Sequence, residues 1–273
     1  MNKLLKNLTI VIVTYKTDFN ILFNCISSIN KNIKIKIIEN SKKFEKKDFV
    51  KKNFPNIEIT CTGKNLGMGS GNNFGLKLVK TRYALVLNPD TECSKDFFKI
   101  LSKYLNPKDN DFSIIGANYK DSKSHLAGGF FEENLHKKVI KNKKNRFLKE
   151  VDWVIGCTML VDLYKFKKKK LFDENFFLFY EEFDLCRQVK LNGGKVYLSN
   201  ELIIKHLGFK GSFAVENKFK LKAIMIRNWH WMWSVFYFHK KNYGYFSAFR
   251  KTIGKLLRSF VKIIFYSLIF NQN

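Results

Sequence analysis

Up to Leu105 the sequence alternates short apolar, mostly β-branched runs with segments that have the periodicity of a helix. The apolar runs cover residues 8–13, 35–38, 57–60 and 83–87. Apolar residues at helical spacing follow Asp18, a suitable helix cap, and further helical segments cover residues 73–80 and 94–105. Strands that alternate with helices form parallel sheets covered on both faces. The sequence therefore predicts an α/β fold with a mostly parallel central sheet flanked by helices.

Polar residues follow three of these runs at the point where each run ends. Thr14 and Tyr15 follow the first run, Glu39 the second, and Asn88 with Asp90 the fourth. Ligands of such sheets bind at the carboxyl ends of the strands. We therefore expect these side chains to line one edge of the sheet, where a ligand would bind.

The formal net charge of the 273-residue chain is +27, from 50 Lys and Arg against 23 Asp and Glu. Such an excess favours a polyanionic partner, either nucleic acid or an anionic membrane surface. Lys, Asn, Ile and Phe are all abundant, so compositional drift of the coding sequence accounts equally well for part of the lysine excess. The five cysteines are odd in number and contain no CxxC pair, which is typical of reduced thiols in a cytosolic protein. The apolar segment near the N-terminus lacks a small-residue cleavage site, so we expect a first β-strand there rather than a signal peptide.

Two acidic clusters occur in this basic chain. Asp90 can bind Mg²⁺ or Mn²⁺ together with substrate phosphates, or it can end a strand in a turn. Glu181, Glu182 and Asp184 follow the aromatic run FFLFY. They can start a helix, whose dipole favours acidic residues, or hold a general base whose pKa is raised by burial and like charges. His206, after another apolar run, is either a metal ligand or a capped core histidine.

A glycine-rich stretch, NLGMGSGNNFG, covers residues 65–75. Its backbone amides can cradle phosphates at the start of a helix, or its glycines can allow a tight turn or a close approach. The stretch comes too late in the chain for a dinucleotide-binding fingerprint, and no GxxxxGK[ST] motif is present. By itself it therefore leaves the two interpretations open.

The order of the motifs is more specific than any one of them. The series TYK, IENS, NLGMGSGNNFG, LNPDT, WVIGCTMLV, FDENFFLFYEEFDLC and IIKHLGFKGS resembles the family 2 inverting glycosyltransferases with the GT-A fold, especially the rhamnosyltransferase-like members of bacterial polysaccharide synthesis. The resemblance implies a Rossmann-like GT-A catalytic domain at residues 1–212. It also implies metal-dependent transfer of a sugar, with a rhamnose-like sugar favoured, from a dTDP or UDP donor to a saccharide acceptor of O-antigen or capsule.

The resemblance implies roles at the donor site. Asp90 matches the last carboxylate of the DxD motif, which holds Mg²⁺ or Mn²⁺ against the donor diphosphate, and Asn88 stands where the first Asp often does. Glu39 matches the acidic residue that hydrogen-bonds the pyrimidine base. His206 matches a histidine that closes the metal site. The other positions matched to the nucleotide-sugar site are Thr14, Tyr15, Asn65 and Asn73.

The same resemblance implies the catalytic base and the acceptor site. Glu182 matches the second acid of the family's ED pair and would take the proton of the acceptor hydroxyl. Glu181 is its neighbour in that pair, and Asp184 stays open as an alternative base. The segment that borders the acceptor contains Asp152, Trp153 and Gly156.

Residues 213–273 predict a separate C-terminal helical element, rich in aromatic and basic residues. Lys255, Arg258 and Lys262 interrupt its last apolar segment, so an amphipathic helix in the membrane interface fits better than a membrane span. An aromatic belt favours the same location: Trp229, Trp231, Trp233 and Tyr237. We therefore expect a cytoplasmic protein, peripheral on the anionic inner face of the plasma membrane, with a lipid-linked acceptor. The alternative is a helix hairpin that covers the catalytic domain.

Two other functions stay open. Basic charge combined with exposed aromatic residues is also the footprint of a nucleic-acid-binding protein, although no RNP, KH or zinc motif supports it. Within the same fold, a UDP-hexose-dependent glycosyltransferase is the nearer alternative.

Overall fold

The computed structural model describes residues 3–108, 110–119, 127–136, 140–141, 146–166, 170–208 and 220–270. The chain forms two compact units. The first contains Met1–Phe177 and Glu181–Val215, and the second contains Leu178–Tyr180 and Glu216–Asn273. The boundary predicted between residues 212 and 213 lies outside the described residues.

The first unit contains all four predicted strands as β1 to β4. They are β1 Leu8–Thr14, β2 Lys34–Glu39, β3 Ile57–Cys61 and β4 Tyr83–Leu87. The remaining strands are β5 Thr91–Cys93, β6 Ile114–Tyr119, β7 Gly128–Gly129, β8 Ile140–Lys141, β9 Leu148–Glu150, β10 Trp153–Val154, β11 Thr158–Asp162 and β12 Val196–His206. The α-helices are α1 Phe19–Ser27, α2 Lys47–Asn53, α3 Met68–Lys77, α4 Phe97–Tyr104 and α5 Glu181–Leu191, and short 3₁₀ turns cover Lys3–Asn7, Glu132–Asn134 and Leu163–Lys165. The predicted cap of the first helix is confirmed, because Asp18 accepts hydrogen bonds from the backbone amides of Asn20 and Ile21.

Ten strands form one sheet, in which nine follow the order β3-β2-β1-β4-β11-β6-β12-β9-β8 and β5 pairs with β12. β3, β2, β1 and β4 are parallel to one another, and β6 is parallel to β12. β11 runs antiparallel between β4 and β6. The predicted α/β fold with a mostly parallel central sheet is confirmed, and β11 is an antiparallel strand within it.

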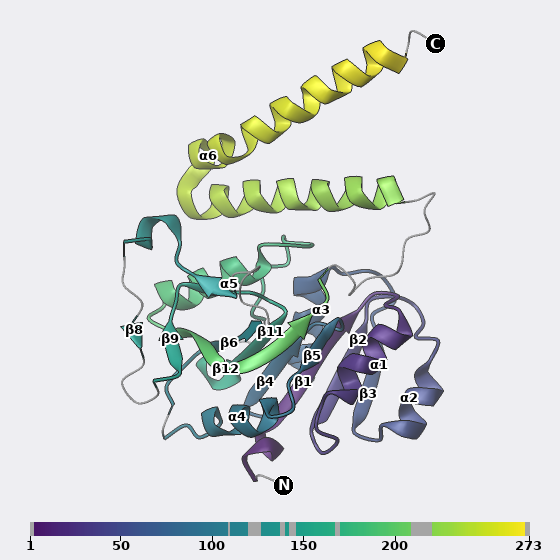
Figure 1. Cartoon of the computed structure of the whole chain (residues 1–273), viewed down its shortest axis with the longest axis vertical. Helices are drawn as coiled ribbons and strands as arrows, with labels where there is room; N and C mark the ends of the chain where they lie inside the picture. The colour runs from purple at the N-terminus through teal and green to yellow at the C-terminus, as the bar shows by residue number, and fades with distance from the viewer. Residues whose placement is uncertain are drawn as a thin grey trace. The chain divides into compact units, whose positions relative to one another are not determined.

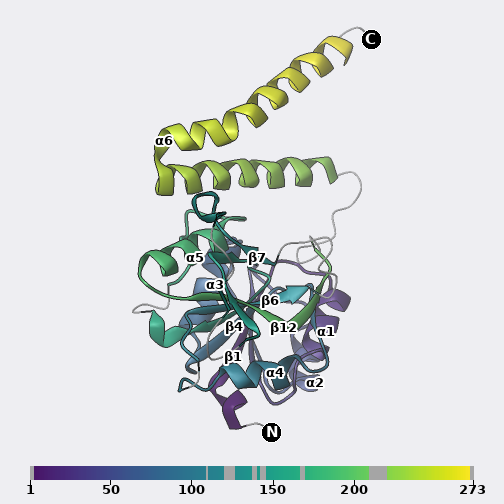
Figure 2. The same ribbon diagram turned by 60° about the vertical axis from the view of Figure 1, so that its left-hand side comes forward.

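Helices cover both faces of this sheet (Figures 1 and 2). Leu8, Ile10 and Ile12 of β1 pack into one core cluster with α1, α2 and α4, whereas Val11 and Val13 pack into a second cluster with α3 and α5. Every residue of β1 is therefore buried. Burial on both faces explains why the strand is a continuous apolar run rather than an alternating one.

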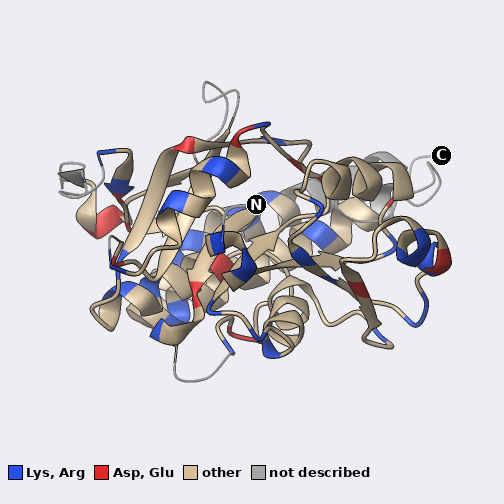
Figure 3. Ribbon diagram, turned by 90° about the horizontal axis from the view of Figure 1, so that it is seen from below, with Lys and Arg blue, Asp and Glu red and all other residues tan. Residues whose placement is uncertain are grey.

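Basic residues occur on most helices and on many loops, where Figure 3 shows them in blue. Some of them pair with acidic residues at the surface. Asp111, for example, lies 2.7 Å from Nζ of Lys165 and 2.8 Å from Nζ of Lys195. Exposed pairs of this kind add little stability. These pairs therefore do not explain why the chain is so basic.

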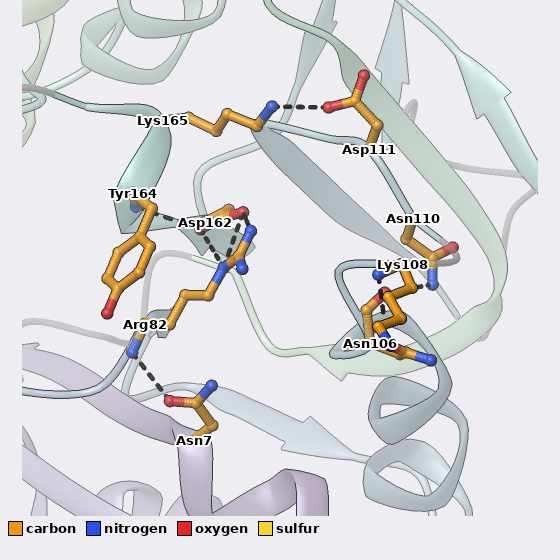
Figure 4. Close-up of polar contacts among 9 residues, drawn as sticks. All are labelled: Asn7, Arg82, Asn106, Lys108, Asn110, Asp111, Asp162, Tyr164 and Lys165. Carbon is orange, nitrogen blue, oxygen red and sulfur yellow. Dashed lines mark hydrogen bonds and ion pairs between the residues drawn. The ribbon is translucent and has the colours of Figure 1, made fainter.

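A bidentate ion pair fixes β11 against the start of β4 (Figure 4). Nε of Arg82 donates to Oδ1 of Asp162 at 3.0 Å, and Nη2 donates to Oδ2 at 2.7 Å. Asp162 also accepts the backbone amide of Tyr164, and its carboxylate is almost fully buried. The register pairs Asp162 with Tyr83 and Thr158 with Leu87. The ion pair thus lies at the opposite end of β4 from Asn88 and Asp90.

The second unit contains the helix α6, Lys220–Phe270, which is interrupted at Gly244 by a non-helical backbone (φ 85°, ψ 171°). We call residues 220–243 the first arm and residues 245–270 the second arm. A hydrogen-bond contact of 3.2 Å between His239 Nδ1 and Ser247 Oγ joins them across the bend. Within the part of the chain that the structure describes, no helix combines the length and apolarity needed to cross a membrane.

Candidate active site

Glu39 joins the carboxyl ends of β1 and β2. The strand register places Thr14 opposite Glu39. The hydroxyl of Thr14 donates a 2.6 Å hydrogen bond to Glu39 Oε2, and the backbone amide of Lys16, at φ 49°, donates a 3.1 Å bond to Oε1. An ionised carboxylate has about four acceptor positions. Glu39 therefore keeps the capacity to accept an N–H group of a ligand.

A cavity of about 630 Å³ lies beside Glu39, and its size suits a nucleotide-sized ligand. Tyr15 and Asn65, two further residues predicted for this site, also line it. Sequence reasoning missed the basic and aromatic side chains of the wall: Lys16, Lys42, Lys43, Lys46, Lys64, Phe19 and Phe44. Their signal was the run of lysines directly after β2. A wall of this composition favours an anionic ligand with a planar ring.

Asp90 and His206 come together although they lie far apart in the sequence. β5 pairs with the end of β12 so that Thr91 faces His206. Oδ1 of Asp90 lies 3.3 Å from Nε2 of His206. The His206 ring also stacks on Tyr119, with ring centroids 6.1 Å apart.

The Asp90–His206 pair offers one carboxylate, the ligand type that Mg²⁺ and Mn²⁺ favour, and one imidazole beside it. Among the described residues there is no group of three or more His, Cys, Asp or Glu side chains that could hold a metal ion. Cations of this kind usually take their other ligands from substrate phosphates and water. The pair therefore fits a cation that is completed by a bound diphosphate. Asn88 lies half-buried two residues earlier, and its backbone amide donates to Cys157 O at 2.9 Å.

Glu181 and Glu182 form the first turn of α5. Glu181 is 7% exposed, and each glutamate has an Oε2 atom without a hydrogen-bond partner among the described residues. Burial raises the pKa of Glu181, and the charge of Glu182 raises it further. Burial also raises the pKa of Glu182, against hydrogen bonds from its own backbone and from Gly156. A carboxylate with a raised pKa is suited to accept a proton near neutral pH.

Gly156 directly faces Glu182. A Cβ atom at Gly156 would lie 3.3–3.5 Å from the Glu182 side chain, so a larger residue would crowd this carboxylate. Trp153 lies beside the same helix, with its ring 4.7 Å from that of Phe183. Asp152 is buried and accepts hydrogen bonds from the Phe131 amide and from Asn134 Nδ2. Trp153 and Gly156, two of the three predicted acceptor residues, thus lie next to α5. Asp152, the third, forms hydrogen bonds to the loop after β7.

The other predicted residues have structural contacts. Asp184 is buried in the first turn of α5. Asn65 accepts the amide of Gly67 in the turn before α3. Asn73 is buried inside α3, where its Oδ1 accepts the amides of Leu171 and Phe172 and its Nδ2 donates to Phe172 O. Asn73 therefore braces the segment that leads to α5, and it is not among the residues that line the cavity.

The charges of both acidic clusters raise the pKa values of the same two buried residues, Tyr119 and Cys157. Burial raises the pKa of Tyr119, and the charges of Cys157, Glu182 and Asp90 add to the rise. Burial also raises the pKa of Cys157 to about 12, with contributions from Asp90 and Glu182. Tyr119 and Cys157, which are in contact at 3.8 Å, therefore both respond to the charges of Asp90 and Glu182. Sequence reasoning did not select either residue: Cys157 lies in the motif WVIGCTMLV without an assigned role, and Tyr119 lies in no motif.

The comparison with protein families matches the model described as "Glycosyl transferase family 2" over residues 9–174, more than half of the chain. The chain belongs to glycosyl transferase family 2. The predicted family is thereby confirmed, and the matched range contains the motifs from TYK to FDE.

Two curated proteins are similar to this family 2 glycosyl transferase. One is the low-salt glycan biosynthesis hexosyltransferase Agl10 of Haloferax volcanii, 26% identical over 197 residues, which are 68% of this chain and 62% of that protein. The other is the rhamnosyltransferase WbbL of Escherichia coli K12, 27% identical over 155 residues, which are 50% of this chain and 59% of that protein. The chain spans about three fifths of the length of each relative.

Solved structures share the fold of the family 2 glycosyl transferase. The mannosyltransferase PcManGT of Pyrobaculum calidifontis, in complex with GDP-Man and Mn²⁺, matches with a TM-score of 0.56 at 9% identity, covering 84% of this chain and 63% of that one. S. aureus TarS 1-349, in complex with UDP-GlcNAc, matches with a TM-score of 0.54 at 12% identity, covering 77% of this chain and 59% of that one. At these identities the likeness shows the fold alone, which confirms the predicted GT-A architecture.

Proposed function

We propose that this chain transfers a sugar from a nucleoside diphosphate donor to a hydroxyl of a saccharide acceptor, with inversion at the anomeric carbon. The observation that carries the proposal is a short series of contacts between the two acidic clusters. His206 lies 3.3 Å from Asp90 and stacks on Tyr119. Tyr119 contacts Cys157, which directly follows the Gly156 that faces Glu182. The carboxylate of Asp90 lies beside His206, where a donor diphosphate would be held. The carboxylate of Glu182 has a raised pKa and is suited to take a proton.

In this mechanism Glu182 removes the proton of the acceptor hydroxyl while the acceptor oxygen attacks the anomeric carbon. The charge of Glu182 raises the pKa of its buried neighbour Glu181, so a second negative charge beside the base is disfavoured. Gly156 leaves the Glu182 carboxylate uncrowded on its side. The lysines of the cavity wall bind the anionic donor, and Asp90 with His206 would hold Mg²⁺ or Mn²⁺. When bound, the cation supplies positive charge for the departing diphosphate.

The donor that we favour carries a pyrimidine base. Glu39 has spare acceptor capacity at the cavity, which suits the N3–H of thymine or uracil. The two curated relatives are named as a rhamnosyltransferase and a hexosyltransferase. We therefore propose dTDP-rhamnose or a related dTDP-sugar as the donor, with a UDP-hexose as the alternative, and cell-surface polysaccharide synthesis as the setting.

The second arm of α6 suits an acceptor that is carried on a lipid at the cytoplasmic face of the membrane. Exposed apolar residues fall on one face at helical spacing: Phe246, Phe249, Leu256, Leu257, Phe260 and Val261. Lys251, Lys255 and Arg258 fall on a neighbouring face, and Ala248 with Thr252 on the buried one. An apolar face beside a basic face is typical of a helix that lies in an anionic membrane interface. We propose that this arm binds such a surface.

The first experiment measures thermal stability with dTDP, UDP or GDP, each with and without Mn²⁺. We expect one nucleotide to raise the melting temperature with Mn²⁺ in the wild type, because a ligand that binds only the folded state stabilises it. The rise should be absent in Asp90→Ala. Asp111→Ala, which changes an exposed aspartate, is the matched control and should keep the rise.

The second experiment tests the base. Glu182→Gln should keep the nucleotide-dependent rise and lower turnover by roughly 10²-fold or more, the usual contribution of a general base. Release of the nucleoside diphosphate from the donor is the readout. Wild-type turnover in Glu182→Gln would contradict the base assignment, and the absence of any nucleotide effect would contradict the donor site.

A further inference from the structure

Phe179 and Tyr180 have left-handed backbone conformations, with φ of 71° and 68°. They directly precede Glu181 and Glu182 in the sequence. Side chains with a Cβ atom rarely adopt this region, and bulky residues least of all. Two such residues in succession persist only where their surroundings determine the conformation, and such strain clusters at functional sites.

The contacts that hold this segment come from the first arm of α6. Ser234 is fully buried, and its hydroxyl donates a 2.8 Å hydrogen bond to the backbone carbonyl of Leu178. The ring of Trp231 lies 5.3 Å from that of Phe179, at 70°, and 5.5 Å from that of Tyr180, at 75°. These residues, Leu178–Tyr180 and the arm, belong to one compact unit.

The residues on either side of the segment are held differently. The backbone carbonyl of Phe177 accepts the amide of Met68 at 2.9 Å, at the start of α3. Glu181 begins α5. Phe177 and Glu181 both belong to the first unit. Three residues held by α6 are therefore joined by one peptide bond to the helix turn that carries the acidic pair. Relaxation of Phe179 and Tyr180 to right-handed conformations would change the direction in which the chain enters α5.

We propose that Trp231 and Ser234 are positioning residues of the transferase, which hold Leu178–Tyr180 in the left-handed conformation that aims Glu182 at the acceptor. This inference rests on the proposed function, in which Glu182 is the base. It assigns to the C-terminal helix a role in turnover that is separate from any contact with a membrane.

The test uses the full chain without membranes and follows release of nucleoside diphosphate from dTDP-rhamnose or UDP-glucose with water as the acceptor. We expect Trp231→Ala to lower kcat roughly 10- to 100-fold, because misplacement of a reacting group by about 1 Å has effects of this size. KM for the donor and the affinity for dTDP or UDP should stay near wild type. Trp231→Phe should restore most of kcat, since a ring can still pack against Phe179 and Tyr180.

Trp229→Ala is the matched control, because it removes the same side chain from the same arm at a position that is 67% exposed. It should keep wild-type kcat. Ser234→Ala, a smaller change, should also lower kcat. If Trp231→Ala does not fold, the kcat of Ser234→Ala tests the positioning role instead. Wild-type kcat in a folded Trp231→Ala or Ser234→Ala protein, or an equal loss in Trp229→Ala, would overturn the inference.

The same series separates this inference from the proposed function. If Glu182→Gln is inactive while Trp231→Ala and Ser234→Ala keep wild-type kcat, the base assignment stands and the positioning role fails. If Glu182→Gln turns over like the wild type, the proposed function fails at the base, and any loss in Trp231→Ala then needs another explanation.

Discussion

Glu181 and Glu182 show how a buried site opposes stability. Both carboxylates lie in the first turn of α5, where the helix dipole favours negative charge. Burial nevertheless raises the pKa of both groups, so the cost of removing charge from water outweighs the dipole. A site that keeps such a pair has a free energy of unfolding that falls as the carboxylates ionise.

Glu181→Gln should therefore stabilise the folded protein at high pH. The pKa of Glu181 in the folded protein lies above its ordinary value of 4.5, so its contribution to stability is full below that value and is lost as pH rises through the folded pKa. The amide carries no charge and avoids this loss. We expect the melting temperature of Glu181→Gln to exceed that of the wild type by a few degrees at pH 8 and to match it at pH 4.

Glu58→Gln is the control for this comparison. Lys36 lowers the pKa of Glu58, which is the opposite direction, and the Glu58 side chain is largely exposed. Its replacement should have little effect at pH 8. Equal melting temperatures of Glu181→Gln and the wild type at both pH values would contradict the account of the acidic pair.

Helix α3 shows what the glycine-rich stretch does at the level of an element. The helix begins at Met68, so Gly69, Gly71 and Gly75 lie inside it. A Cβ atom at Gly71 would lie 2.8 Å from Val13 Cγ1, and one at Gly75 would lie 2.5 Å from Val11 Cγ1. Of the two interpretations from sequence, the close approach of backbone to a neighbour is the one that these contacts support.

Gly75→Ala should destabilise the protein although alanine favours helices. The intrinsic gain is about 1 kcal/mol, whereas overpacking a buried site typically costs about 1–3 kcal/mol and here meets β-branched side chains of two strands. A lower midpoint of urea unfolding is the expected result. Gly254→Ala in α6 has open space around the new Cβ and should leave the midpoint unchanged or raise it. A higher midpoint for Gly75→Ala would show that α3 has room to move away from the sheet.

At the scale of the whole molecule, charge and exposed apolar surface occur together. The chain has a net charge of +27, and the second arm of α6 exposes Phe246 and Phe249 at 85% and 58%. Scattered basic charge alone attracts any polyanion, whether nucleic acid or an anionic membrane surface. An apolar face beside basic residues favours the membrane interface specifically, because apolar side chains gain nothing from a phosphate backbone.

Replacement of Phe246 and Phe249 by Ser should weaken binding to vesicles of phosphatidylglycerol and phosphatidylcholine about 10-fold or more, since each ring would lose its burial in the interface. Co-sedimentation at low and moderate salt measures the effect, and salt should weaken binding of the wild type as it screens the basic residues. Tyr164→Ser, at another strongly exposed aromatic residue, is the control and should bind as the wild type does. If the double variant and the wild type partition equally, the membrane role fails, and a salt-dependent gel shift with nucleic acid becomes the next test.

Local patterns in the sequence determined the strands β1 to β4, the capped start of α1 and the start of α5. Each depends on residues within a few positions of one another, so periodicity, capping and the helix dipole suffice to predict it. The order of the motifs also determined the family, and with it the selection of Asp90, Glu39 and Glu182. Asp90 lies beside His206 in the structure, and the metal role that the resemblance implies for these two residues stays a prediction.

Tertiary structure alone decided which distant groups meet. Asn73 accepts amides 98 and 99 residues away, and β11 enters the sheet antiparallel between β4 and β6. The contact of Tyr119 with Cys157 and the contacts of α6 with Leu178–Tyr180 likewise carry no local signal. The physical reason is that such contacts depend on how strands and helices pack, and packing is a property of the whole chain rather than of any short stretch.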